Sequence, residues 1–122
     1  MKILMVAYDN DSYITWFPQG LAYLASAARN AGHEIEVYQQ DIFHWPDSHL
    51  TEYLDQHDFD VVEVSVIGGY YQYRKLMALS EAINASKKRG GAEIYDWRAR
   101  TGRGSGILFA ENRSGCCWNW RR

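Results

Sequence analysis

The sequence has only two cysteines and no long apolar run, the features that crosslink small proteins or hold them in membranes. Its two cysteines, Cys116 and Cys117, are adjacent, which excludes a disulfide framework or a spaced zinc site and favours a reducing, cytoplasmic setting. No apolar run approaches the roughly eighteen residues of a membrane helix, so we expect no membrane partner. We also expect no secretory signal, because a strand-like run begins at Lys2, and no GxGxxG fingerprint of dinucleotide-binding proteins occurs.

The formal net charge is only −2, but the charges are unevenly distributed. Residues 1–86 contain four Lys/Arg and twelve Asp/Glu, whereas residues 87–122 contain nine Lys/Arg and three Asp/Glu. Arginines interleaved with Trp118 and Trp120 are typical of a groove for single-stranded nucleic acid, so an RNA-binding protein that uses this basic tail is one alternative. Because no periodic pattern predicts a fold to display these side chains, we expect no nucleic-acid partner.

Residues 1–87 alternate between strand and helix patterns. Apolar runs predict strands at Lys2–Tyr8, His33–Tyr38 and Asp60–Ile67. Helical spacing predicts helices from Pro18 to just before Gly32, from Asp47 or Ser48 to about His57, and from Tyr70 to about Lys87. The β-α-β-α-β-α order predicts an α/β fold, a doubly wound (Rossmann-like or flavodoxin-like) parallel sheet with three clear strands and a degraded fourth. Ligands of such sheets bind outside the carboxyl ends of the strands.

Several positions within these elements are expected to face the core. On the second strand, Ile35 and Val37 share one side. In the third strand Glu63 interrupts an apolar run, where a small or apolar residue would fit better. The helices are expected to turn these residues inward: Leu21, Leu24, Ala25 and Ala28; Leu50, Tyr53 and Leu54; and Tyr73, Leu76, Met77, Leu79, Ala82 and Ile83.

The pattern changes after Lys88. Ala92–Trp97 is at most a weak fourth strand, and no period of two or 3.6 follows it. Residues 90–122 contain six of the ten glycines and three of the five tryptophans. We therefore divide the chain into an incomplete α/β domain at 1–89 and an aberrant basic Gly/Arg/Trp tail at 90–122, expected to be disordered.

Residues 1–88, about seven-tenths of the chain, resemble the N-terminal cobalamin-binding domain of cobalamin-dependent radical S-adenosylmethionine enzymes. Three segments carry the resemblance: MKILMVAYDNDSY, FPQGLAYLASAARNAGHEIEVY and FDVVEVSVIGGYYQYRK. The resemblance implies a corrinoid ligand, cobalamin, and a radical domain normally present in the same chain. The iron–sulfur cluster and S-adenosylmethionine would belong to that missing domain, whose CxxxCxxC motif is not visible here. We therefore expect a truncated module with no catalytic residues of its own and weak cobalamin affinity.

A frameshift is our hypothesis for the tail. Tryptophan has the single codon TGG, and reading one base later turns Trp97, Trp118 and Trp120 into glycines. Permissible codons for Ile94 through Cys117 then allow a buried strand, a GGHGP loop and a helix, which the family shows at this place. Sequencing the encoding DNA past the codon for Lys88 decides the matter, because early stops in the shifted frame would contradict the hypothesis.

The resemblance implies a cofactor site formed by three segments. The loop after the first strand and the start of the first helix would contact the corrin ring and its amide side chains. The end of the third strand would accept the nucleotide tail in a slot. The implied residues are Asp9, Asn10, Asp11, Tyr13, Trp16, Pro18, Gln19, Gly20, Ser65, Val66, Ile67, Gly68, Gly69, Tyr70 and Tyr71. Taken without the resemblance, the same residues are consistent with a solvated Asx-turn, a bare helix start and a glycine-containing βα turn.

The histidines do not supply a metal site by their pattern. Many cobalamin proteins place a histidine on cobalt through a DxHxxG loop, but here Asn10 and Asp11 follow Asp9. We therefore read His33, His44, His49 and His57 as ordinary surface or core residues, and predict cobalamin bound without a protein histidine on cobalt. A flavodoxin-like nucleotide-binding or regulatory domain with the same fold is the main alternative function.

Overall fold

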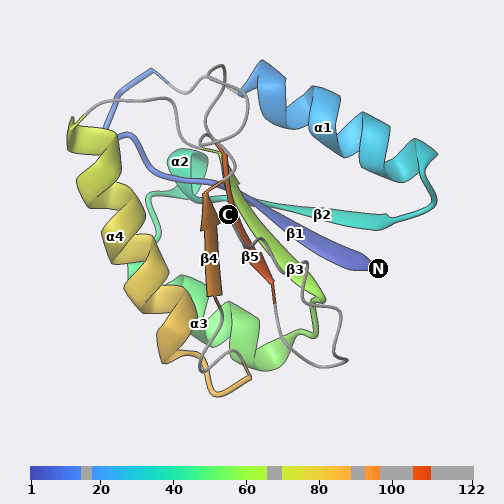
Figure 1. The fold of residues 1–122 in the computed structure, drawn as a ribbon. Helices are drawn as coiled ribbons and strands as arrows, with labels where there is room; N and C mark the ends of the chain where they lie inside the picture. The colour runs from blue at the N-terminus through green and yellow to red at the C-terminus, as the bar shows by residue number, and fades with distance from the viewer. Residues whose placement is uncertain (15–17, 66–69, 89–92, 97–105, 111–122) are drawn as a thin grey trace.

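A three-stranded parallel sheet with helices on both faces forms the centre of the molecule (Figure 1). The computed structural model describes residues 1–14, 18–65, 70–88, 93–96 and 106–110. The elements in chain order are β1 (Lys2–Ala7), α1 (Gln19–Asn30), β2 (Glu34–Gln39), α2 (Gln40–Phe43), α3 (Asp47–Gln56), β3 (Val61–Ser65), α4 (Tyr70–Ala85), β4 (Glu93–Asp96) and β5 (Gly106–Ala110). The predicted α/β fold class is confirmed.

Strand β1 lies at the centre of the parallel sheet. Ile3 pairs with Ile35 of β2 on one side and with Val61 of β3 on the other. Both faces of β1 are covered, since Ile3 to Ala7 are all buried. This explains why the strand is a continuous apolar run rather than an alternating one.

Helix α1 covers one face of the sheet and helices α3 and α4 cover the other (Figure 1). On the α1 face, the buried cluster consists of Ile3, Met5, Ala7, Leu21 and Ala25, with Ala28, Ile35, Val37 and Val61 packed against it. On the opposite face, it consists of Leu4, Val6, Tyr8, Tyr38, Leu50, Leu54, Phe59, Val62, Val64, Leu76, Leu79 and Ile83. The alternation of β1 residues between the two clusters is the period-two signature of a strand.

The end of α1 follows the glycine signal in the sequence. Gly32 has φ 86°, in the left-handed region that favours glycine. Its N–H donates to the carbonyl of Arg29 (2.9 Å), and the N–H of His33 donates to that of Ala28 (3.0 Å). These two bonds form a Schellman motif, which satisfies carbonyls at the end of the helix and returns the chain to β2.

Helices α3 and α4 are joined by side-chain hydrogen bonds near the end of α4. Asp55 accepts hydrogen bonds from the Ser86 hydroxyl (2.7 Å) and the Lys87 amide (2.8 Å). The Thr51 hydroxyl donates to the Ala82 carbonyl at 2.7 Å. The Ser86 bond is the largest cause that holds the pKa of Asp55 below its usual value.

The connection after β2 contains the four-residue helix α2, which the sequence analysis did not predict. Helix α3 begins at Asp47, one of its two predicted starts, and its N-cap residue is Pro46, with no side-chain capping hydrogen bond. The Asp47 carboxylate instead accepts a hydrogen bond from Gln40 Nε2 at 2.7 Å. The Asp47 side chain thus bonds a buried amide from another element and does not cap the helix backbone.

Three predicted core residues are exposed. Leu24 of α1 and Tyr73 and Met77 of α4 lie at the surface, whereas the other inward positions predicted for the three helices are buried or partly buried. Ser80, which was not predicted, is buried and donates to the Leu76 carbonyl (2.8 Å). Position 80 shares a helix face with 76 and 83, so the α4 stripe is centred on these positions and turned away from 73 and 77.

The edge of β3 is occupied by a strand that the sequence analysis did not predict. The sheet order is β2-β1-β3-β5-β4, with β5 antiparallel to β3 and β4 antiparallel to β5. Both strands come from the segment expected to be disordered, and the weak fourth strand β4 lies one position further out than a parallel order would place it. Pairing with β5 satisfies backbone groups that β3 would otherwise leave open at a sheet edge.

None of the helices in the described part of the chain has the length and apolar composition that crossing a bilayer requires.

Candidate ligand site at the carboxyl edge of the sheet

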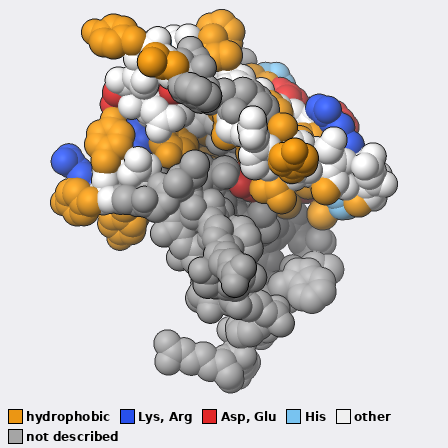
Figure 2. All heavy atoms as spheres, turned by 90° about the horizontal axis from the view of Figure 1, so that it is seen from above, with side chains coloured by type: hydrophobic (Ala, Val, Ile, Leu, Met, Phe, Trp, Pro, Cys, Tyr) orange, Lys and Arg blue, Asp and Glu red, His pale blue; other side chains and the backbone are white. Residues whose placement is uncertain are grey.

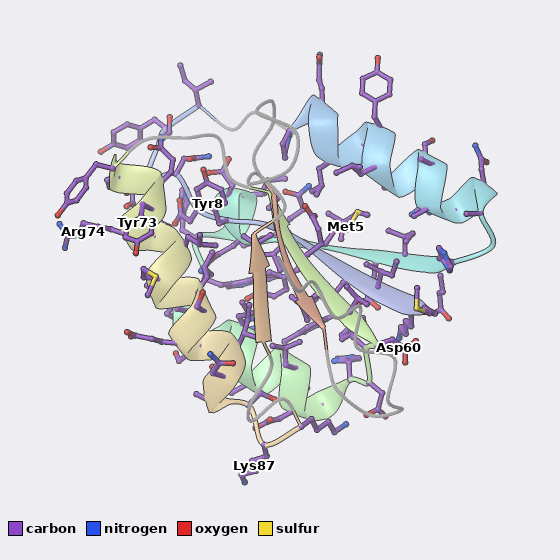
Figure 3. All side chains as sticks on the ribbon, in the orientation of Figure 1. Met5, Tyr8, Asp60, Tyr73, Arg74 and Lys87 are labelled. Atoms are coloured by element: carbon purple, nitrogen blue, oxygen red, sulfur yellow. The ribbon has the colours of Figure 1, made fainter. Side chains whose placement is uncertain are left out.

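Three connections meet where the parallel strands end. The loop after β1, helix α2 after β2 and the start of α4 after β3 lie at the same end of the sheet (Figure 1). Tyr8, at the end of β1, turns toward the α4 side, whereas Met5 faces α1 (Figure 3). The sequence analysis placed the candidate ligand site at this edge.

Asp9 anchors the loop after β1. Its side chain is 8% exposed; Oδ1 accepts the amide N–H of Asp11 (2.8 Å), and Oδ2 lies 2.9 Å from Nδ1 of His44. Its own amide donates to Gln40 Oε1 at 3.3 Å. The first loop is therefore attached to α2 through a buried carboxylate that has several hydrogen-bond partners.

The Asp9–His44 contact shifts the pKa values of both groups. Burial by itself would raise the pKa of Asp9, but the hydrogen bonds from His44 and Asp11 and the positive charges of His44 and Lys75 outweigh it, so that pKa is lowered. The hydrogen bond to Asp9, followed by the charge of Asp9, raises the pKa of His44. The pair is an ionised carboxylate that orients a histidine exposed to solvent.

A second carboxylate, Asp41, lies beside the same loop. Asp41 is buried, and its Oδ1 accepts the amide N–H of Asn10 at 2.9 Å. The neighbouring Gln40 is fully buried and uses Nε2 to bond the Trp45 carbonyl (2.8 Å) and Asp47. Helix α2 thus contributes polar side chains that hold the loop after β1 in place.

A hydrogen bond joins the loop after β1 to the start of α4. The Tyr71 hydroxyl donates to Oδ2 of Asp11, across the end of the sheet. Asp11 has φ 53°, a left-handed conformation that aspartate tolerates better than most residues. The bond to Asp11 is the largest cause that raises the pKa of Tyr71. Two of the predicted site segments are therefore in direct contact.

Exposed apolar side chains surround this polar cluster. Figure 2, seen from above, shows hydrophobic side chains around this end of the molecule. They come from all three connections: Tyr13 and Ile14, Ile42 and Phe43, and Tyr70, Tyr71 and Tyr73. Exposed apolar side chains from three connections at one end of a sheet could contact a ligand bound there.

The structure places most of the predicted site residues at this edge. Asp9 is buried, Pro18 is half-buried, and Ser65 is the last residue of β3. The exposed ones are Asn10, Asp11, Tyr13, Gln19, Gly20, Tyr70 and Tyr71. An added Cβ at Gly20 would meet no atom within 4 Å, so close packing does not require glycine there. Trp16, Val66, Ile67, Gly68 and Gly69 lie outside the described residues.

The sequence analysis missed the contribution of α2. Gln40, Asp41 and His44 all contact the loop after β1. A four-residue helix has no useful periodicity, and the available signal was only their position after the second strand, at the carboxyl edge. His44 was interpreted as ordinary because the sequence offers no spacing that links it to Asp9.

An aromatic ladder extends from this edge along β2 and α3. It begins at exposed Phe43, which stacks on Trp45 with ring centroids 4.5 Å apart, and continues through His49, Tyr38, Tyr53, His57 and Phe59. The Tyr38 hydroxyl lies 2.7 Å from Nδ1 of His49. Burial, followed by the charge of Asp47, raises the pKa of Tyr38 well above its usual range. Within the described residues, no three His, Cys, Asp or Glu side chains are grouped to hold a metal ion.

Glu63 is a buried acidic residue on β3, away from the polar cluster around Asp9 and Asp41. It is 6% exposed at the middle of β3, and its Oε2 has no hydrogen-bond partner among the described residues. Burial raises the pKa of the Glu63 carboxyl to about 7. The interruption that the sequence shows in this strand is therefore a real buried acid.

Comparison of the chain with protein-family models, with curated proteins and with solved structures gave no match.

Proposed function

We propose that the carboxyl edge of the sheet binds a corrinoid, cobalamin, and that the chain is a binding module rather than a catalyst. The observation that carries the proposal is the contact between Asp11 and Tyr71, which unites the loop after β1 with the start of α4. The resemblance to cobalamin-binding domains implies that the first segment contacts the corrin ring and the second accepts the nucleotide tail of the same ligand. A large planar ligand would contact both segments and the exposed apolar side chains around them.

The charges at this edge favour contact with the amide-bearing corrin ring over contact with a phosphate group. Three carboxylates, those of Asp9, Asp11 and Asp41, lie in the connections after β1 and β2. Carboxylates accept hydrogen bonds from amide N–H groups, which a corrin carries on its periphery, and repel phosphate. This distribution favours a corrinoid, whose ring can lie at these carboxylates with its tail phosphate elsewhere, over a nucleotide that a flavodoxin-like domain would hold through phosphate at the same strand ends.

Glu63 Oε2, which has no hydrogen-bond partner among the described residues, bears on whether this site suits the cofactor. A buried polar atom without a partner is costly and suggests an unseen partner, and the nucleotide tail of cobalamin carries a ring nitrogen that could fill that role. In the intact enzymes that the chain resembles, bound cobalamin supplies methyl transfer or assists radical chemistry. Asn10, Asp11 and Tyr71 of this chain would bind and orient it.

A corrinoid titration followed by visible absorbance tests the proposal. We expect saturable binding of methylcobalamin by the wild-type chain, weakened about tenfold in the double variant Asp11→Ala/Tyr71→Phe because two hydrogen-bonding groups are lost. Glu52→Ala removes an exposed carboxylate on α3 and serves as the matched control with unchanged affinity.

Other ligands provide the contrary outcomes. Stabilisation of the fold by a phosphate-bearing nucleotide, without corrinoid binding, would favour the flavodoxin-like alternative. RNA binding with a steep salt dependence would favour a role for the basic tail.

A further inference from the structure

We propose that Tyr38 is a redox-active tyrosine, which gives an electron through Trp45 to an oxidised metal complex at the carboxyl edge and its phenolic proton to His49. The step breaks the O–H bond of Tyr38 and forms an N–H bond at Nδ1 of His49. It leaves a neutral tyrosyl radical and an imidazolium, and the metal complex is reduced by one electron. The inference does not rest on the proposed function, since any metal complex that accepts one electron at this edge would serve.

The proton acceptor of Tyr38 is already in place. A phenol that loses an electron also loses its proton, so the oxidation of a tyrosine needs a base within reach. The Tyr38 hydroxyl lies 2.7 Å from Nδ1 of His49. A neutral imidazole with its proton on Nε2 accepts a hydrogen bond at Nδ1. The proton can therefore cross one short hydrogen bond while both rings stay where they are.

The surroundings of Tyr38 favour the products of this step. Tyr38 is only 3% exposed, so a radical formed there is shielded from other molecules in solution. Burial, followed by the charge of Asp47, raises the pKa of Tyr38, which keeps it a phenol until the electron leaves. The same negative charge that opposes a phenolate attracts the positive charge that the transfer creates on His49.

Trp45 connects Tyr38 with the carboxyl edge. Its ring centroid lies 5.3 Å from that of Tyr38 and 4.5 Å from that of the exposed Phe43 of α2. The Trp45 ring is half-buried, so an oxidant at this edge can approach it. Indole and phenol are the side chains that lose an electron most readily, and here the two rings are near enough to be in contact. The electron therefore needs no intermediate group between Tyr38 and Trp45.

Tyr53 is the competing site on the same aromatic ladder. Its ring centroid lies 5.3 Å from that of Tyr38, and its hydroxyl donates a hydrogen bond to Oε1 of Glu36. A carboxylate is ordinarily a weaker base than an imidazole, and Tyr53 is only half-buried. We therefore expect the oxidising equivalent to remain on Tyr38, and Tyr53 provides the comparison that tests this assignment.

Photochemical oxidation of the full chain tests the proposal. A laser flash on tris(bipyridine)ruthenium(II) with an electron acceptor generates the ruthenium(III) complex, and transient absorbance follows the tyrosyl radical. Exposed tyrosines also form radicals, but these couple with one another and decay, whereas a buried radical persists. Samples frozen after that decay should show a tyrosyl EPR signal in the wild-type chain. Its coupling to the proton received by His49 should disappear in D2O.

Two substitutions identify the radical site. Tyr38→Phe keeps the buried ring and should abolish the persistent signal. Tyr53→Phe should leave it in place, and so should Tyr23→Phe at an exposed position of α1, which is the matched control. Circular dichroism checks that each variant is folded.

Two further substitutions test the paths of the proton and the electron without removing Tyr38. His49→Phe keeps a ring at this position but removes the base, and should slow the formation of the persistent radical about tenfold. Trp45→Phe should also slow it, because a phenyl ring is much harder to oxidise than an indole. The control is His57→Phe, which replaces the imidazole stacked on Tyr53 and should leave the rate unchanged.

The contrary outcomes are distinct. Absence of a persistent radical from the wild-type chain, or its survival in Tyr38→Phe, would overturn the proposal. Loss of the signal in Tyr53→Phe alone would assign the radical to the Tyr53–Glu36 pair instead. An unchanged rate in His49→Phe would overturn the role of His49 as proton acceptor, and this variant carries the test if Tyr38→Phe does not fold. None of these results bears on corrinoid binding.

Discussion

The two faces of the sheet differ in how they are built. The face beneath α3 and α4 buries twelve of the described residues in one apolar cluster, including two tyrosines and a phenylalanine. The face beneath α1 buries five, and β3 presents to it an acid, Glu63, whose Oε2 has no hydrogen-bond partner among the described residues. The first face therefore provides most of the apolar stabilisation, whereas the second tolerates a polar group whose cost only a ligand or a proton can offset.

Core truncation is the largest expected effect and tests this asymmetry. Leu79→Ala, on the α4 side, should lower the free energy of unfolding by about 4 kcal/mol because its cavity is surrounded by a large cluster. Leu21→Ala, on the α1 side, should cost about 2–3 kcal/mol. Urea denaturation measures both, and Met77→Ala at a largely exposed position is the control. A larger cost for Leu21→Ala would reverse the comparison.

The second largest effect is expected in the pH dependence of stability, to which the buried Glu63 carboxyl contributes. Its pKa is raised from 4.5 to about 7 in the folded chain, so its contribution is fully present below about pH 4.5 and is lost as the pH rises through 7. The shift corresponds to about 3 kcal/mol. Glu63→Gln should abolish this part of the slope in urea denaturation between pH 5 and pH 8.5. An unchanged slope would mean that Glu63 ionises as easily in the fold as in the unfolded chain.

A smaller effect is expected from the polar contact inside the aromatic ladder. Tyr38→Phe removes the hydroxyl that lies 2.7 Å from His49 and leaves that ring nitrogen without its partner. The expected loss is about 1–2 kcal/mol of unfolding free energy. Tyr23→Phe, at an exposed position of α1, should have no measurable effect. Equal effects of the two substitutions would show that the buried hydroxyl contributes nothing to the α3/α4 face.

The smallest expected effect is a change in the pKa of His44, at the carboxyl edge of the sheet that both faces share. Asp9→Asn removes the carboxylate whose hydrogen bond and charge raise the pKa of His44. The pKa of His44 should therefore fall toward its usual value, as followed by the imidazole resonances in NMR. Glu52→Ala, at an exposed carboxylate of α3, is the control and should leave the His44 resonances unchanged. A His44 curve that does not move would contradict the Asp9–His44 contact.

Predictions from local pattern were successful where one element decides the outcome. The three parallel strands, the left-handed Gly32 and the inward faces of Leu50 and Leu54 follow from apolar periodicity and steric freedom. The prediction that Tyr73 and Met77 face the core was wrong, since both are exposed. A helix of mixed polarity has several possible apolar faces, and packing against α3 selects one of them.

Contacts between distant segments could not be predicted in the same way. Asp9 and His44 are 35 positions apart, and Asp11 and Tyr71 are 60 apart. No spacing rule links such pairs, because the loops that carry them are brought together only when the strands assemble. The pairing of β5 with β3 was missed for a similar reason, since a short strand is selected by the open edge it fills.

The sequence by itself determined the order of the three parallel strands and of helices α1, α3 and α4, the acid in the third strand and the polar character of the loops at the carboxyl edge, because these depend on side-chain chemistry and local periodicity. Tertiary structure alone decided which acids are buried, which histidine meets a carboxylate and which two loops touch. The physical reason is that burial and electrostatic coupling depend on neighbours in space, and for this chain those neighbours come from segments up to 60 residues away.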